Sequence, residues 1–138
     1  PLALLGTHNK CVQSDAEGVY LGVGSYGDLG LPLINNQEIT LGKPGEKIQG
    51  KNLDKILTGV AQIPSELREK ISEINYTDEE GFVFYTLDGI QCRIGFPEDM
   101  SKKGQALLDI LSNLQNQGHK VVYINMSYVG NPVVKYEE

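Results

Sequence analysis

The sequence between Ile74 and Ile94 predicts a three-stranded antiparallel meander. Phe82–Leu87 and Ile90–Ile94 are short runs rich in aromatic and β-branched residues, and the dipeptide Asp88-Gly89 separates them. Asp-Gly between two such runs is a strong signal for a two-residue hairpin turn, because both residues can adopt positive φ. Ile74–Thr77 is expected to be a further strand, joined to the hairpin by a turn at residues 78–81.

The returning strand of this meander alternates cleanly between two faces. Ile90, Cys92 and Ile94 fall on one side, whereas Gln91 and Arg93 fall on the other. Successive side chains of a strand point to opposite faces of a sheet. The apolar set is therefore expected on the inner face of the sheet and the polar set on its outer face.

Two helical segments are predicted before the meander. Apolar residues recur at intervals of three and four over residues 53–61, directly after Asn52, which is a suitable N-cap. Pro64 is expected to end this helix. A second, shorter helix is expected over Ser65–Ile71, with Ser65 as its cap. The short connection places the two helices side by side.

A third helix is predicted from about Ser101 to Gln117, and Gly118 suits the position just past its end. Its apolar side is formed by Leu107, Ile110, Leu111 and Leu114. Its other side is expected to be polar, with Lys102, Lys103, Gln105 and Asp109. Because that polar side is mixed rather than basic, the helix is expected to pack on the sheet and not on a membrane.

Strand patterns are present at both ends of the chain. Leu2–Leu5, Lys10–Gln13 and Val19–Leu21 predict a meander at the N-terminal end, and Leu31–Ile34 is expected to be extended and apolar. Near the other end, Lys120–Tyr128 predicts a central strand. One face of that strand is expected to carry Val122, Ile124, Met126 and Tyr128.

The last strand, Val133–Tyr136, begins directly after Pro132 and is expected at a sheet edge. Proline has no N–H to donate to a neighbouring strand, which confines it largely to edges. Together these elements predict an α+β fold. We expect a mixed, largely antiparallel β-sheet with two to three amphipathic helices packed on one face.

The glycines of GVGSYG, from Gly22 to Gly27, have the spacing of a dinucleotide-binding loop. In such a loop the third glycine opens a helix whose N-terminal amides bind the pyrophosphate. Here Gly27 is followed by a segment with Gly30 and Pro32, where a helix would have to continue. No cofactor is therefore expected, and the stretch is predicted to be a Gly-rich surface loop between two strands.

Composition and charge bear on the possible functions. A formal net charge of −6 and a pI near 4.9 disfavour nucleic acid, because phosphate binding needs clustered Lys and Arg. No apolar run approaches the roughly 18 residues of a membrane helix. Cys11 and Cys92 have no metal-ligand spacing and are expected to be mostly buried thiols, although their pairing stays open. His8 and His119 are expected at solvated loop positions.

An enzyme is not expected, because the sequence has neither G-x-S-x-G nor H-E-x-x-H, and no Cys near a His in a familiar context. The carboxylate run at residues 78–80 is interpreted as a solvated turn. Two alternatives stay open: a hydrolase built from scattered residues, and a generic extracellular module that binds a peptide or a glycan.

The chain resembles the extracytoplasmic β domain of the FtsQ/DivIB family of bacterial cell-division proteins along nearly its whole length. The order and spacing of several short segments carry the resemblance. These segments are PLALL at residues 1–5, SDAEGVYL at 14–21, LPLI at 31–34, LDGIQCRIG at 87–95, KKGQALLDILSNL at 102–114 and VVYINMSYVGNPVVKY at 121–136. Many members have Asp-Leu where this chain has Asn125-Met126, a departure that we interpret as neutral for the fold.

The resemblance implies a scaffold and not a catalyst. Residues 1–138 are expected to form a single β domain, cut from a longer protein whose membrane helix and POTRA domain lie before residue 1. Family members sit in the cytoplasmic membrane with this domain outside, at the division septum. There they join FtsB/DivIC-like and FtsL-like bitopic proteins and help to control septal wall synthesis. The membrane is therefore expected to be contacted only through the missing helix.

The resemblance also implies a binding site, because the last strands of the family's β domain take up a strand from the FtsB-like partner. This agrees with the exposed final edge expected from Pro132. Carried over by position, the expected contact residues are Tyr128, Gly130, Asn131, Val133, Val134 and Tyr136. Two of these residues also have an alternative interpretation. Tyr128 could be a packed core residue, and Tyr136 could be a residue of a frayed tail.

Overall fold

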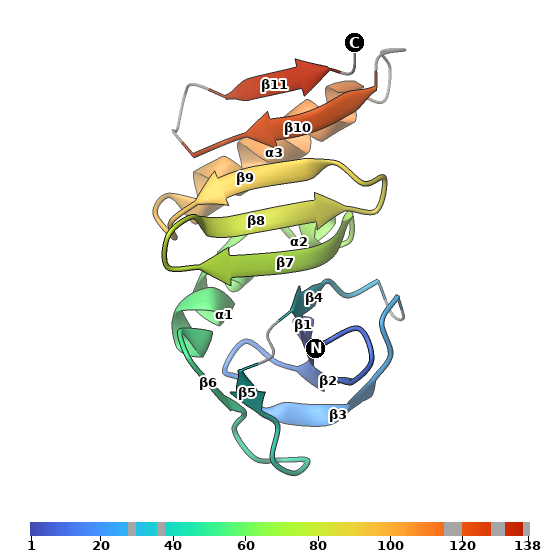
Figure 1. Ribbon diagram of the computed structural model, residues 1–138, viewed down its shortest axis with the longest axis vertical. Helices are drawn as coiled ribbons and strands as arrows, with labels where there is room; N and C mark the ends of the chain where they lie inside the picture. The colour runs from blue at the N-terminus through green and yellow to red at the C-terminus, as the bar shows by residue number, and fades with distance from the viewer. Residues whose placement is uncertain (28–29, 36–37, 115–119, 128–131, 137–138) are drawn as a thin grey trace.

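The predicted meander forms the middle of a nine-stranded sheet. The computed structural model describes residues 1–27, 30–35, 38–114, 120–127 and 132–136 (Figure 1). Strands β7 (Ile71–Thr77), β8 (Gly81–Thr86) and β9 (Gln91–Gly95) pair antiparallel, as the alternation of their residues predicted.

The other strands extend the meander on both sides. The order of the sheet is β11-β10-β9-β8-β7-β4-β1-β2-β3. The added strands are β1 (Ala3–Gly6), β2 (Cys11–Ser14), β3 (Tyr20–Gly24), β4 (Leu33–Asn35), β10 (Val121–Asn125) and β11 (Val133–Tyr136). The pairs β1–β4, β4–β7 and β9–β10 are parallel, and the other five are antiparallel. The predicted α+β class with a mixed, mostly antiparallel sheet is therefore confirmed.

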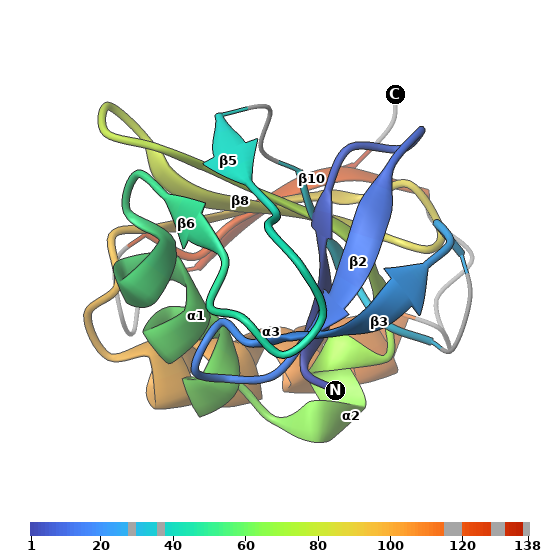
Figure 2. The same cartoon turned by 90° about the horizontal axis from the view of Figure 1, so that it is seen from below.

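Two further strands, β5 (Ile39–Thr40) and β6 (Gln49–Gly50), form a small separate sheet that the sequence did not predict. Three helices cover one face of the large sheet (Figures 1 and 2). They are α1 (Leu53–Gln62), α2 (Ser65–Arg68) and α3 (Met100–Leu114).

One apolar row of side chains crosses the sheet and faces these helices. It runs through register partners Val12, Leu5, Ile34, Ile74, Phe84, Cys92, Ile124 and Val134. All of these are buried except Val134, which is partly buried against the same core. Because a one-residue slip would turn a strand's whole apolar set to the other face, this row fixes the register of eight strands.

The helix ends differ from those predicted. α2 is only four residues long, and Ile71 opens β7 instead of closing the helix. Pro64 occupies the N-cap position of α2, so Ser65 is its first residue. Asn52 does precede α1, but it has φ of 62° and makes no capping bond. Its Nδ2 instead donates to Asp78 Oδ1 at 2.8 Å, which ties α1 to the turn between β7 and β8.

Three local predictions about strands and turns are wrong. The hairpin turn has three residues rather than two, with Gly89 at φ 85° and its N–H donating to the Thr86 carbonyl at 3.0 Å. Gly22–Gly24 belong to β3 and not to a loop. Val122 does not share the buried face of Ile124 and Met126 but is exposed, because a β-bulge in β10 shifts the register between Val121 and Tyr123.

Both cysteines are buried thiols, as expected, and no disulfide joins them. Burial raises the pKa of Cys92 to about 12. His8 lies in an exposed turn, but its Nε2 is 2.7 Å from Glu73 Oε1 and its ring meets the Tyr26 ring edge-on. His119 and the predicted helix residues beyond Leu114 lie outside the described part of the chain.

Lys103 corrects the predicted polar side of α3, because this residue is only 5% exposed. Its ammonium donates to the Phe96 carbonyl at 3.1 Å, over the start of the helix. Burial lowers the pKa of Lys103 below its usual 10.5. The aliphatic part of the Lys103 side chain is therefore buried, at a position where the sequence pattern predicted a solvent-exposed residue.

The burial of Lys103 leads to a prediction about how the stability of the protein depends on pH. A lysine with a lowered folded-state pKa loses its proton first in the folded protein, so the unfolded state then binds more protons and stability rises with pH. We expect Lys103→Met to fold, since the Phe96 carbonyl keeps the Glu98 N–H at 2.7 Å. The free energy of unfolding of the wild type, minus that of the variant, should increase as the pH rises from neutral to the usual lysine pKa of 10.5. Urea titrations across this range test it, and a difference that is flat or falls with pH would contradict it.

Candidate partner-binding edge

Strand β11 ends the large sheet, as its position after Pro132 predicted. It pairs antiparallel with β10 through Tyr123↔Lys135, Ile124↔Val134 and Asn125↔Val133. No strand of the described chain lies on its other side (Figure 1). The main chain of an edge strand presents a row of N–H and C=O groups that an added strand can pair with.

The side chains of β11 differ in whether they pack against the core or are exposed. Val134 faces the helices and packs against the core. Val133 is 49% exposed and Tyr136 is 40% exposed, so two large apolar side chains lie open along a short edge. Val134 therefore packs β11 against the core, in addition to the pairing with β10, while the side chains of Val133 and Tyr136 stay accessible.

The six residues predicted as contacts divide into two groups. Val133, Val134 and Tyr136 all lie on β11, as expected of an edge strand. Tyr128, Gly130 and Asn131 lie outside the described residues.

Beside this edge, the helix-free face of the sheet carries an aromatic ring between two cations. The Arg93 guanidinium carbon lies 4.4 Å from the centre of the Tyr123 ring, and Lys135 Nζ lies 5.9 Å from it. Arg93 Nε also donates to Gln91 Oε1 at 3.1 Å. This local cationic surface contrasts with the net charge of −6 of the whole chain.

A hollow of about 430 Å³ adjoins this surface on the same face. Its walls are formed by Glu80, Val83, Gln91, Arg93 and Ser127. The sequence placed Gln91 and Arg93 correctly on the outer face, but it did not mark Tyr123, Lys135 or the hollow as part of a site. Their proximity depends on the parallel pairing of β9 with β10, which brings Gln91 opposite Tyr123 from distant parts of the chain.

The described residues were compared with the features of metal sites and of membrane-spanning helices. Among them, no three or more His, Cys, Asp or Glu side chains come together as metal ligands. None of the helices in this part of the chain has the length and apolar character needed to cross a membrane.

The fold and the edge define an α+β domain whose large mixed sheet is open at its last strand. The family model for the C-terminal domain of the cell division proteins FtsQ/DivIB matches residues 8–127, and the chain belongs to this family. A comparison with curated proteins gave no match. The matched region ends before β11, so the edge strand itself lies beyond it.

Membership of the family indicates a role in cell division. FtsQ/DivIB proteins are non-enzymatic proteins of the membrane at the division site.

Proposed function

We propose that this domain is a divisome scaffold that binds its partner by strand addition at β11. The partner is the extracytoplasmic part of an FtsB/DivIC-like protein, held together with an FtsL-like one, and the assembly helps to control septal wall synthesis. The domain acts on the extracytoplasmic face at the septum, and a membrane helix outside these 138 residues anchors it.

The observation that carries this proposal is the open edge of β11, with Val133 and Tyr136 exposed beside it. Main-chain hydrogen bonds to an added strand supply affinity, and the side chains along the edge supply selectivity. Val134 keeps β11 attached to the core, so the edge exists before the partner arrives and less ordering entropy is lost on binding. Tyr128, Gly130 and Asn131 belong to the proposed contact set as the segment that leads into β11.

The test is a calorimetric titration of this domain with the extracytoplasmic region of the cognate FtsB/DivIC-like protein. We expect Tyr136→Ala to weaken binding about 10- to 30-fold, since truncating a buried interface aromatic costs about 2 kcal/mol. Val133→Ala should weaken it by about fivefold. Backbone amide shifts on binding should concentrate in β10 and β11.

Val122→Ala is the matched control, because Val122 is a valine of similar exposure, 46%, on β10 and not on the edge strand. It should leave the affinity unchanged. Equal losses for Val122→Ala and Val133→Ala, or partner-induced shifts confined to the opposite end of the sheet, would contradict the proposal. A folded domain that does not bind would favour the generic peptide- or glycan-binding module instead.

A further inference from the structure

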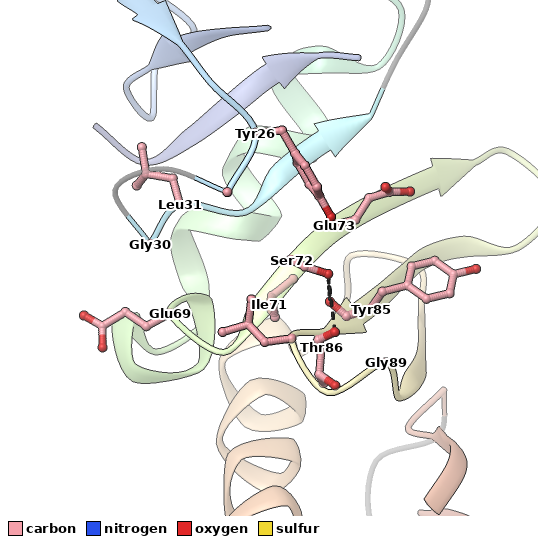
Figure 3. A pocket seen from close by; sticks show the side chains of 12 residues that line it. Tyr26, Gly30, Leu31, Glu69, Ile71, Ser72, Glu73, Tyr85, Thr86 and Gly89 are labelled. Atoms are coloured by element: carbon pink, nitrogen blue, oxygen red, sulfur yellow. Dashed lines mark hydrogen bonds between the residues drawn. The ribbon is translucent and has the colours of Figure 1, made fainter. Parts of the chain in front are cut away.

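A second cavity lies at a split in the sheet, four strands away from β11. It holds about 620 Å³ and opens between the segment before β4 and the start of β7 (Figure 3). Parallel pairing of β4 with β7 covers only Leu33↔Glu73 and Ile34↔Ile74. Ile71 and Ser72 therefore have no neighbouring strand on the β4 side among the described residues.

A β-bulge at Ser72 shapes the split. The register between β7 and β8 shifts between Ile71 and Glu73, so Ser72 is the extra residue. Its hydroxyl donates to the carbonyls of Tyr85, at 3.1 Å, and Thr86, at 3.3 Å (Figure 3). Bulges are over-represented at sheet edges and next to active sites.

The walls of this cavity combine apolar surface with negative charge. Leu31, Ile71 and Leu87 supply aliphatic surface, and Leu87 is 69% exposed at the rim. Among the described lining residues the only charged side chains are Glu69 and Glu73, and no lysine or arginine lines the cavity. Glu73 accepts from Asn75 at 3.1 Å in addition to its contact with His8, so it is held in place, while Glu69 is exposed.

We propose that this cavity binds an extended segment of a partner polypeptide that places an apolar side chain inside and flanking Lys or Arg side chains against Glu69 on one side of the cavity and Glu73 on the other (Figure 3). Apolar walls match the first group. The two carboxylates match the second, since no lysine or arginine among the described lining residues offsets their charge. The unpaired stretch of β7 offers main-chain groups to a segment in extended conformation, which a small ligand would not need. This site is separate from the β11 edge and goes beyond the proposed function.

The test uses NMR of the domain with three end-blocked hexapeptides as probes. One alternates lysine with leucine, one alternates glutamate with leucine, and one alternates lysine with serine. We expect the lysine–leucine peptide to give saturable shifts at Ile71–Glu73 and at residues 85–89, and the other two to bind several-fold more weakly. Leu87→Ser and Glu69→Lys should each weaken binding about threefold or more, as expected from losing rim contact or reversing an exposed charge.

Glu17→Lys is the matched control, since Glu17 is also an exposed glutamate and lies outside the cavity. It should leave the binding of the lysine–leucine peptide unchanged. If Glu17→Lys weakens binding as much as Glu69→Lys does, the attraction is only to the acidic surface and the proposal fails. It also fails if both leucine peptides bind equally, or if the same amides shift with protein concentration alone, which would identify a second copy of the chain as the occupant.

Discussion

Replacing Gly81 with alanine is expected to lower the free energy of unfolding by about 3 kcal/mol or more. Gly81 opens β8 with φ of 74°, a left-handed conformation that costs a residue with a Cβ about 1–2 kcal/mol. An added Cβ would also lie 2.5 Å from the Gly95 carbonyl oxygen and 2.7 Å from the Phe96 nitrogen. Backbone atoms of Gly95 and Phe96 cannot turn away as a flexible side chain could, so β8 and the end of β9 would have to separate at this point.

Gly89→Ala is the control for the conformational part of this cost. Gly89 has φ of 85°, but no atom lies within 4 Å of the position that its Cβ would take. The Gly89→Ala variant should lose only about 1 kcal/mol of its free energy of unfolding. Urea denaturation followed by circular dichroism measures both variants. Equal losses for Gly81→Ala and Gly89→Ala would show that the close approach of Gly95 has no energetic effect.

A second large effect is expected for Phe82→Ala, which should destabilise the domain by about 3–5 kcal/mol. Phe82 is fully buried, and its ring meets those of Tyr76 and Phe84 edge-on, with centroids 5.0 and 5.7 Å away. The ring also lies against Gly59 of α1, where an added Cβ would be 2.8 Å from it. Its removal would leave a cavity between the sheet and α1. Because small domains are stable by only about 5–15 kcal/mol, much of the stability would be lost.

Phe96→Ala provides the comparison for this variant, since Phe96 is 46% exposed after β9. It removes the same atoms but should cost less than about 1 kcal/mol. Thermal unfolding followed by near-ultraviolet circular dichroism separates the two. If Phe82→Ala were as mild as Phe96→Ala, the close packing of α1 on β8 described above would be wrong.

Local sequence patterns predicted the elements that local physics controls. The alternation over Gln91–Ile94 placed each of its residues on the correct face, and the period of three and four located α1 to within a residue. Pro132 predicted the edge strand, because the missing N–H is a property of the residue itself. In each case the information lies within a few neighbouring residues.

The errors occur where distant segments meet. Lys103 is buried where its ammonium bonds to the Phe96 carbonyl over the start of α3. Val122 is turned outward by a bulge in the pairing of β10 with β11. Asn52 bonds to Asp78, which is 26 residues away, rather than capping its own helix. A pattern of neighbouring residues gives no information about contact partners that lie far away in the sequence.

The sequence by itself determined most strands of the large sheet, helix α1, the inward face of β9 and the open last strand, since propensity, alternation and proline chemistry act within a few residues. Only the tertiary structure decided the order of the nine strands, the cationic face around Tyr123 and the split between β4 and β7. These features arise from parallel pairings between segments far apart in the chain. The free energy of such pairings depends on the packing of the whole sheet against its helices and not on the residues of either strand alone.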